Sequence, residues 1–192
     1  TSKQWDCETC YNKKSKCDGH FGSLVLNYPV KNPIFIDQLL KWLKVICFSC
    51  GNIATSKVII RRSEKSNILT TYAKNTPGGT VCAYCKEIHP TISKNALKPN
   101  MFQYSYAEDI DKKELFNHEI LDVLEKITPE TLTIIGKPII SHPKKFIIRI
   151  LRVSPNTTRP EAKPTNGSRS SSPDTTALLK NIIEQNNILP SV

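Results

Sequence analysis

Eight residues of this chain have the type and spacing of metal ligands. The first four follow the pattern Cys-x2-Cys-x6-Cys-x2-His and are Cys7, Cys10, Cys17 and His20. The second four form two Cys-x2-Cys pairs and are Cys47, Cys50, Cys82 and Cys85. A pair with this spacing can sit on one tight turn, and two such turns complete the tetrahedron of a structural zinc site. We therefore predict two bound Zn2+ ions.

Both predicted sites are closed, because each has four protein ligands, whereas a catalytic zinc keeps one position open. The two sets use all seven cysteines, and an odd number of cysteines argues against a fully disulfide-bonded secreted scaffold. One alternative stays open at the second site, where His89 could replace a cysteine. We expect His89 instead to be an ordinary surface histidine before Pro90.

The rest of the chain offers no catalytic constellation. It has no glycine-rich phosphate loop, and its cysteines are committed to metal. Asp109, Asp111 and Glu114 lie close together, but we interpret them as caps and dipole partners at the start of a helix. We expect His118 and His142 to be structural. The sequence thus predicts no catalytic residue and no cofactor-binding residue other than the metal ligands, so the chain alone should be inactive.

The charge of the chain favours a polyanionic partner. Lysine and arginine total 27 against 17 acidic residues, a formal charge of +10. A zinc site with three thiolates and one neutral imidazole carries −1, and one with four thiolates carries −2, so two occupied sites leave +7. This surplus is typical of nucleic-acid binding. Solubility alone is the alternative explanation.

Periodicity predicts an α+β fold: a small zinc-stapled module with short strands, amphipathic helices and irregular loops. The predicted helices are 33–45, 112–127, 129–135 and one that begins at Asp174. The predicted strands are 23–30, 53–62, 91–97, 102–106 and 146–153. Residues 63–79 appear polar and end in an evident loop, and Trp42 is expected in the core.

Residues 155–173 differ in composition from the rest, with four prolines and many Ser, Thr and Asn residues. By composition alone they form a linker, a mobile loop or a plain surface loop. The chain begins at Thr1 with its first ligand six residues later, so we interpret it as a fragment of a longer protein. Neither a signal peptide nor a membrane span is evident, which suggests a soluble protein of a reducing compartment.

The first ligand set, its continuation Phe21-Gly22 and the strand that ends in Pro29-Val30 resemble the start of the largest subunit of multisubunit DNA-directed RNA polymerase. The likeness is to the eukaryotic, archaeal and large-DNA-virus type. It continues, in chain order, through Cys47–Gly51, 90–94, 119–120, 132–136, Arg159-Pro160 and 174–183.

The resemblance implies the clamp, a mobile region that closes over DNA and the RNA–DNA hybrid during transcription. Residues 1–90 would be a clamp head with both zincs, 91–154 a mixed α/β part, 155–173 a lid-like basic loop and 174–192 the start of the next helix. It also implies contacts with other polymerase subunits, especially the second-largest. The loop would contact nucleic acid through Arg159, Lys163 and Arg169. The catalytic Mg2+ of the complete nucleotidyltransferase would be bound further downstream.

Some features depart from the family. The pair Cys82-x2-Cys85 is compact, residues 63–80 are short and the lid sequence diverges. Together with the bias toward Asn, Lys and Ile, these departures favour a viral or divergent enzyme, located in the nucleus, or in the cytoplasm and virion for a virus. The alternatives are a free-standing zinc-ribbon transcription factor that binds nucleic acid, and a zinc-dependent protein-interaction module.

Overall fold

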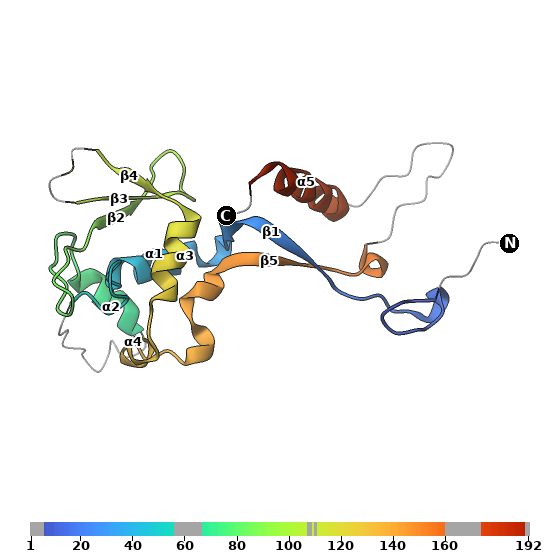
Figure 1. Cartoon of the computed structure of the whole chain (residues 1–192), viewed down its shortest axis with the longest axis horizontal. Helices are drawn as coiled ribbons and strands as arrows, with labels where there is room; N and C mark the ends of the chain where they lie inside the picture. Colours follow the sequence, from blue (N-terminus) through green and yellow to red (C-terminus); the bar gives the residue numbers. More distant parts are fainter. Residues whose placement is uncertain (1–5, 56–66, 107–108, 110, 160–173, 191–192) are drawn as a thin grey trace. The chain divides into compact units, whose positions relative to one another are not determined.

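The structure is a computed structural model that describes residues 6–55, 67–106, 109, 111–159 and 174–190. By their internal contacts the residues form two compact units (Figure 1). One unit combines residues 1–28 with 149–192, and the other consists of residues 29–148. Strands β1 (Gly22–Lys31) and β5 (Ile147–Val153), which pair in a two-stranded sheet, each contain residues of both units.

Four α-helices of the unit 29–148 follow from apolar residues at helical spacing. They are α1 (Ile36–Val45), α2 (Ile68–Asn75), α3 (Asn117–Glu125) and α4 (Pro129–Ile134). The Asn32 side chain accepts a hydrogen bond from Ile34 N at 3.1 Å and caps the turn η2 (Pro33–Phe35) that leads into α1. Thr128 caps α4 in the same way, and Gly136, with φ of 71°, ends it as predicted.

A three-stranded antiparallel sheet also belongs to this unit. Its order is β2 (Thr91–Lys94), β3 (Phe102–Ser105) and β4 (Lys113–Leu115), with Ile92 opposite Tyr104 and Phe102 opposite Leu115. The prediction of one helix over 112–127 was therefore wrong in its first turn. Pairing with β3 overrides helical periodicity there, and α3 begins only at Asn117. The Glu119 side chain caps the start of this helix by accepting a hydrogen bond from Phe116 N at 2.7 Å.

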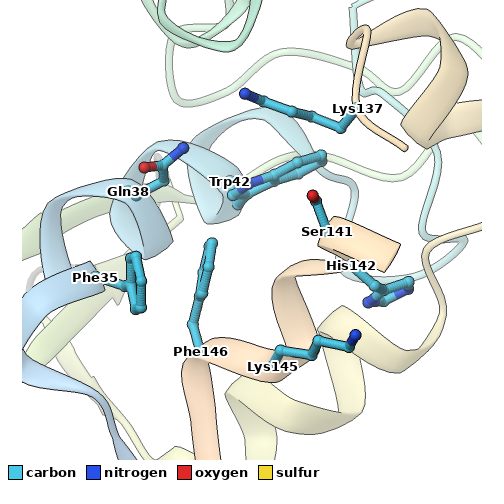
Figure 2. Close-up of a pocket in the computed structure, with 8 residues that line it drawn as sticks. All are labelled: Phe35, Gln38, Trp42, Lys137, Ser141, His142, Lys145 and Phe146. Atoms are coloured by element: carbon cyan, nitrogen blue, oxygen red, sulfur yellow. The ribbon is translucent and has the colours of Figure 1, made fainter. Parts of the chain in front are cut away.

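The unit 29–148 contains a contiguous hydrophobic core. Every buried hydrophobic residue in the described part of the chain lies between Ile36 and Ile147. Trp42 is 1% exposed, which confirms the prediction that it belongs to the core. One edge of its indole also lines a pocket (Figure 2).

The other unit is held together differently. Its helix α5 (Asp174–Ile188) is fixed to β1 by a pair of asparagines. The Asn186 side chain accepts a hydrogen bond from Asn27 N at 2.7 Å and donates one to Val25 O at 3.1 Å, and Asn27 Nδ2 donates to Asn186 O at 2.8 Å. These bonds satisfy backbone groups that a neighbouring strand would otherwise pair. The apolar side chains Leu178, Ile182 and Ile183 on α5 remain exposed.

Two further findings differ from the sequence analysis. No helix was predicted in the polar stretch 63–79, but α2 occupies 68–75 because Leu69 and Tyr72 are buried against the core. Asp109 and Glu114 do not lie at a helix start: Asp109 accepts from Tyr106 N, and Glu114 belongs to β4.

Most of the predicted strand 53–62 lies outside the described residues. The division into a clamp head, a mixed α/β part, a lid-like loop and a following helix stays a prediction. The two units are defined by contacts and not by function. None of the helices in the described part of the chain is long and apolar enough to cross a membrane.

Replacing Leu43 by Ala should destabilise the unit 29–148, because its side chain is fully buried in the core. We expect the free energy of unfolding to fall by about 2–5 kcal/mol. Leu97→Ala is the matched control, since the same atoms are removed from a side chain that is 92% exposed, and it should change stability by about 0.5 kcal/mol or less. Urea unfolding followed by circular dichroism measures both; equal losses would contradict the assigned core.

Candidate metal centres

The three Cys-x2-Cys pairs share one backbone turn. In each, the N–H of the first cysteine donates to the carbonyl five residues later: Cys7 to Asn12, Cys47 to Asn52 and Cys82 to Glu87, at 2.8–2.9 Å. The N–H four residues later returns a bond to the carbonyl of the first cysteine, at 2.7–3.0 Å. Isolated bridges close the turns, as between Ile46 and Ile53. This repeated geometry directs both sulfurs of a pair toward one side.

The fifth residue of each turn needs a left-handed backbone. Tyr11, Gly51 and Lys86 occupy this position with φ of 56°, 70° and 68°. Only glycine adopts this region without a steric cost. At position 51 glycine is also required by packing, since an added Cβ would lie 2.2 Å from the carbonyl oxygen of Lys126.

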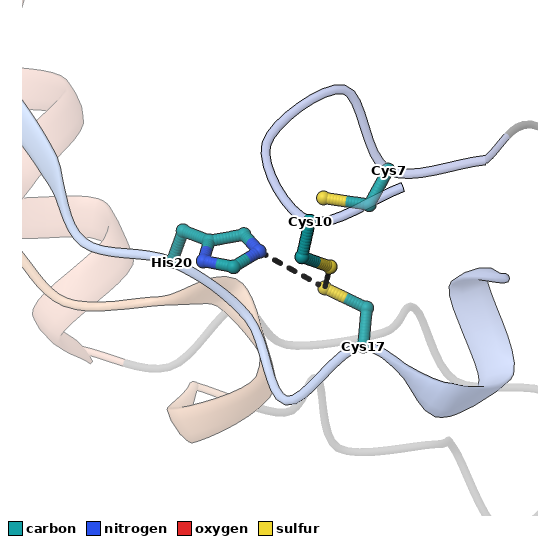
Figure 3. Close-up of side chains that lie close together, drawn as sticks. All are labelled: Cys7, Cys10, Cys17 and His20. Atoms are coloured by element: carbon teal, nitrogen blue, oxygen red, sulfur yellow. Dashed lines mark hydrogen bonds between the residues drawn. The ribbon is translucent and has the colours of Figure 1, made fainter. Parts of the chain in front are cut away.

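The first cluster is formed by Cys7, Cys10, Cys17 and His20, as predicted (Figure 3). Cys10 Sγ lies 3.7 Å from Cys17 Sγ, and Cys17 Sγ lies 3.4 Å from His20 Nε2. The three cysteines are half-buried and the histidine is exposed. All of these residues belong to the unit of residues 1–28 and 149–192.

The second cluster is formed by Cys47, Cys50, Cys82 and Cys85, all in the unit 29–148. Cys47 Sγ lies 3.5 Å from Cys85 Sγ, and Cys50 Sγ lies 3.7 Å from Cys82 Sγ. A backbone hydrogen bond from Ala83 N to Ala54 O at 3.1 Å joins the two turns. Lys126, which follows α3, supports the turn of Cys47 and Cys50, because its Nζ donates to Phe48 O at 2.8 Å.

Both clusters have the dimensions of a tetrahedral zinc site. The four ligand atoms of each set lie within 4.8 Å of one another. With Zn–S bonds of about 2.3 Å, tetrahedral geometry separates two sulfurs by about 3.8 Å and a sulfur from an imidazole nitrogen by about 3.6 Å. The observed pairs are close to these values, and thiolate with imidazole is the donor set that zinc prefers. Both clusters could therefore hold Zn2+.

The thiol environments differ within each cluster. Backbone N–H groups of Cys10 and Thr9 lower the pKa of Cys7 to about 6, and the N–H of Glu87 lowers the pKa of Cys85 to about 7. Burial raises the pKa of Cys47 to about 12 and also raises that of Cys50. Burial thus opposes thiolate formation at Cys47 and Cys50, and a cation beside these two sulfurs would stabilise their thiolates.

His89 is not the surface residue that the sequence suggested. It is 2% exposed, and its ring packs edge-on against Phe48 at a centroid distance of 5.9 Å. Burial lowers its pKa to about 4, opposed by the backbone of Lys44, so it is neutral at neutral pH. Its nitrogens lie outside the second cluster, which consists of four cysteines.

Comparison with known proteins identifies the family. The profile described as RNA polymerase Rpb1, domain 1, matches residues 1–192. The chain belongs to this family. The DNA-directed RNA polymerase RPB1 homolog of African swine fever virus (isolate Pig/Kenya/KEN-50/1950) is 30% identical over 194 residues, which are 99% of this chain and 13% of that protein.

Archaeal and further viral relatives agree with this assignment. The DNA-directed RNA polymerase subunit Rpo1N of Methanocaldococcus jannaschii is 30% identical over 95% of this chain and 14% of its own length. The probable DNA-directed RNA polymerase II subunit RPB1 homolog of Invertebrate iridescent virus 6 is 24% identical over 97% of this chain and 20% of its own length. The chain thus spans only between an eighth and a fifth of these relatives.

Of the three residues predicted to contact nucleic acid, the structure describes only Arg159. Arg159 lies at the base of the lid-like segment, where its guanidinium donates to Ser154 O at 3.0 Å, Asn156 Oδ1 at 2.7 Å and Thr176 Oγ1 at 3.0 Å. These bonds tie the segment to the first turn of α5. Lys163 and Arg169 lie outside the described residues. Contact of all three with nucleic acid stays a prediction.

The sequence did not predict the contacts between residues 156–158 and the first cluster. The turn η6 (Asn156–Thr158) follows β5, and Thr157 Oγ1 donates to Asp18 O at 2.6 Å. An added Cβ on Gly19 would lie 2.4 Å from Thr157 Oγ1, so this glycine permits the close approach. Only the Gly in Cys17-x-Gly-His20 hinted at it in the sequence.

Gly51→Ala should damage the second cluster, because the new Cβ would collide with the Lys126 backbone as well as strain φ. Gly79→Ala is the matched control: its φ is 84°, but nothing lies within 4 Å of the new Cβ. We expect the control to lose about 1–2 kcal/mol of stability and Gly51→Ala clearly more. Chemical denaturation of the metal-loaded chain gives both values, and equal losses would show that packing against Lys126 is unimportant.

Proposed function

We propose that this chain is the clamp region of the largest subunit of a DNA-directed RNA polymerase, which closes over DNA and the RNA–DNA hybrid during transcription. The observation that carries the proposal is a match to RNA polymerase Rpb1, domain 1, over residues 1–192, in a chain that retains both ligand sets. The whole protein would then be a nucleotidyltransferase. This chain contributes binding and closure to it, while the Mg2+ and the catalytic residues belong to other parts.

Zinc would have a structural role, and it would matter most in the unit of residues 1–28 and 149–192. The described part of this unit contains no buried hydrophobic core residue, because all of these lie between Ile36 and Ile147. A small unit without such a core needs another source of folding free energy. Structural zinc supplies about 10 kcal/mol or more in small zinc-binding domains. We infer that the first zinc holds residues 7–20 in place, and that the second reinforces a unit that already has a core.

The contacts of Thr157 and Arg159 support a mechanical link from the first zinc to nucleic acid. Thr157 bonds to the backbone between Cys17 and His20, and Arg159 ties the same turn to α5. A rigid metal site would therefore fix the position of the turn Asn156–Thr158 and of Arg159. We infer that Lys163 and Arg169 contact phosphates, whereas Arg159 acts first as a brace at that base.

The partners we propose are DNA, the RNA–DNA hybrid and other polymerase subunits, the second-largest above all. The surplus of positive charge that remains after zinc binding favours a polyanionic partner. The localisation we propose is the nucleus, or the cytoplasm and virion if the enzyme is viral. No specific observation favours a free-standing zinc-ribbon factor.

Cys10→Ser should lower the zinc content of the chain from two ions to one and unfold the first cluster. Cys50→Ser is the matched variant, since it should also lose one zinc. The two should differ in their consequences: Cys10→Ser should abolish amide-exchange protection around residues 7–20 and 154–159, whereas Cys50→Ser should leave most of the core of residues 29–148 protected, because that unit has hydrophobic packing. Elemental analysis and hydrogen exchange measure both effects. Retention of two zincs by Cys10→Ser would contradict the assigned ligand set.

The clamp function is testable in the complete polymerase. Lys163→Gln combined with Arg169→Gln should shorten the half-life of elongation complexes at raised salt and reduce the slope of log K against log salt by about 1.5. Lys98→Gln with Lys112→Gln removes the same charge from exposed positions elsewhere and serves as the control. Half-lives follow from retention of labelled RNA on immobilised complexes. Equal behaviour of the two variants would overturn the proposed contacts, and absence of the chain from a purified polymerase would overturn the function itself.

A further inference from the structure

A pocket unrelated to either metal cluster lies in the unit 29–148 (Figure 2). Its volume is about 360 Å3, within the range of sites that accept a small molecule or a bulky side chain. Three aromatic rings form its apolar part. Phe35 and Phe146 stack at a centroid distance of 4.6 Å, and the buried Trp42 lies beside them. The two phenylalanines already occupy each other's inner faces, so a ligand would contact their outer surfaces, next to the buried indole.

The polar lining of the pocket is cationic. Lys137 and Lys145 both line it, and Figure 2 shows them on opposite sides of the aromatic group. Lys145 Nζ donates one hydrogen bond to Ile140 O at 2.8 Å and keeps two donors for a ligand. Among the residues that the structure describes, Lys137 Nζ has no hydrogen-bond or ion-pair partner, and no acidic side chain lines the pocket. An occupant with negative charge would complement this lining.

The third basic group, His142, has a structural role at the wall. Its Nδ1 accepts from Lys144 N at 3.2 Å, and its Nε2 lies 3.3 Å from Ile127 O, an arrangement that suits the neutral ring. Burial lowers its pKa, helped by Lys144 and Lys145 and opposed by the Ile127 backbone and Glu125. The two lysines therefore supply the positive charge of the pocket. His142 holds the backbone at Lys144 and Ile127 in place through its two ring nitrogens.

Exposed aliphatic residues are neighbours in the sequence of residues that line the pocket. Ile139 and Ile140 connect its residues Lys137 and Ser141 and are 66% and 75% exposed, and Ile34, next to Phe35, is 83% exposed. Aliphatic groups around an aromatic pocket are typical of protein-binding surfaces. A nucleic-acid strand would gain little from them, because its sugar–phosphate backbone favours polar and basic neighbours.

We propose that this pocket binds an acidic peptide segment of another protein, with one bulky apolar side chain inserted beside Phe35, Phe146 and Trp42 and its carboxylates facing Lys137 and Lys145. The inserted side chain supplies affinity by leaving water, and the two cations select acidic neighbours on either side of it. The site is independent of the proposed clamp contacts with DNA, since it uses neither metal cluster nor the lid-like segment.

The test uses the full zinc-loaded chain and a fluorescein-labelled peptide of twelve residues with a central phenylalanine and three acidic residues on each side. Fluorescence anisotropy should detect saturable binding, and a peptide with the acidic residues replaced by their amides should bind at least fivefold more weakly. Lys137→Gln with Lys145→Gln should weaken binding of the acidic peptide about fivefold or more, and Phe35→Ala about tenfold. Lys98→Gln with Lys112→Gln, which removes the same charge elsewhere, should leave it unchanged.

A second readout locates the bound peptide. The chain has two tryptophans, so Trp5→Phe leaves Trp42 as the sole indole, and its emission should change on saturation. Three outcomes would overturn the proposal. The first is no binding at 1 mM peptide, and the second is equal weakening of peptide binding by the control lysine pair. The third is that binding of a single-stranded oligonucleotide depends on Lys137, Lys145 and Phe35 while binding of the peptide does not. The last result would assign the pocket to nucleic acid.

Discussion

The structure depends on short backbone turns that aim ligand atoms at a common point. Three Cys-x2-Cys turns use the same pair of hydrogen bonds and the same left-handed fifth residue, although that residue is Tyr11, Gly51 or Lys86. A tetrahedral cation tolerates little variation in the distance between its ligands. The hydrogen bonds of these turns are therefore the local basis of both clusters.

The two clusters lie in units of different kinds. The unit 29–148 has a continuous hydrophobic core, so packing already holds the body that carries its four cysteines. In the other unit the described contacts include hydrogen bonds, such as those of Asn186 with β1 and of Thr157 with Asp18, an ion pair between Lys180 and Glu184 at 4.0 Å, and an exposed cation–π contact between Arg152 and Phe21 at 5.7 Å. Under the proposed function, convergence of its four ligands on zinc would have a larger share in ordering that unit.

Arg159 illustrates how one residue can serve architecture where composition suggests binding. A basic residue in a polar, proline-rich segment is typical of phosphate contact. In the structure its guanidinium is already bonded to Ser154, Asn156 and Thr176, which places the start of the segment and the first turn of α5 together.

The sequence by itself determined the two clusters of possible metal ligands, the α+β class, most helix positions and the family, because ligand spacing, caps and periodicity are local properties. It could not reveal α2, since residues 68–75 within the polar stretch form a helix only where Leu69 and Tyr72 meet the core. It misjudged Lys113–Leu115, where pairing with β3 overrides helical periodicity. It also missed the burial of His89 and the pocket of Phe35, Trp42 and Phe146. These features arise from contacts between residues far apart in the chain, which only the tertiary structure brings together.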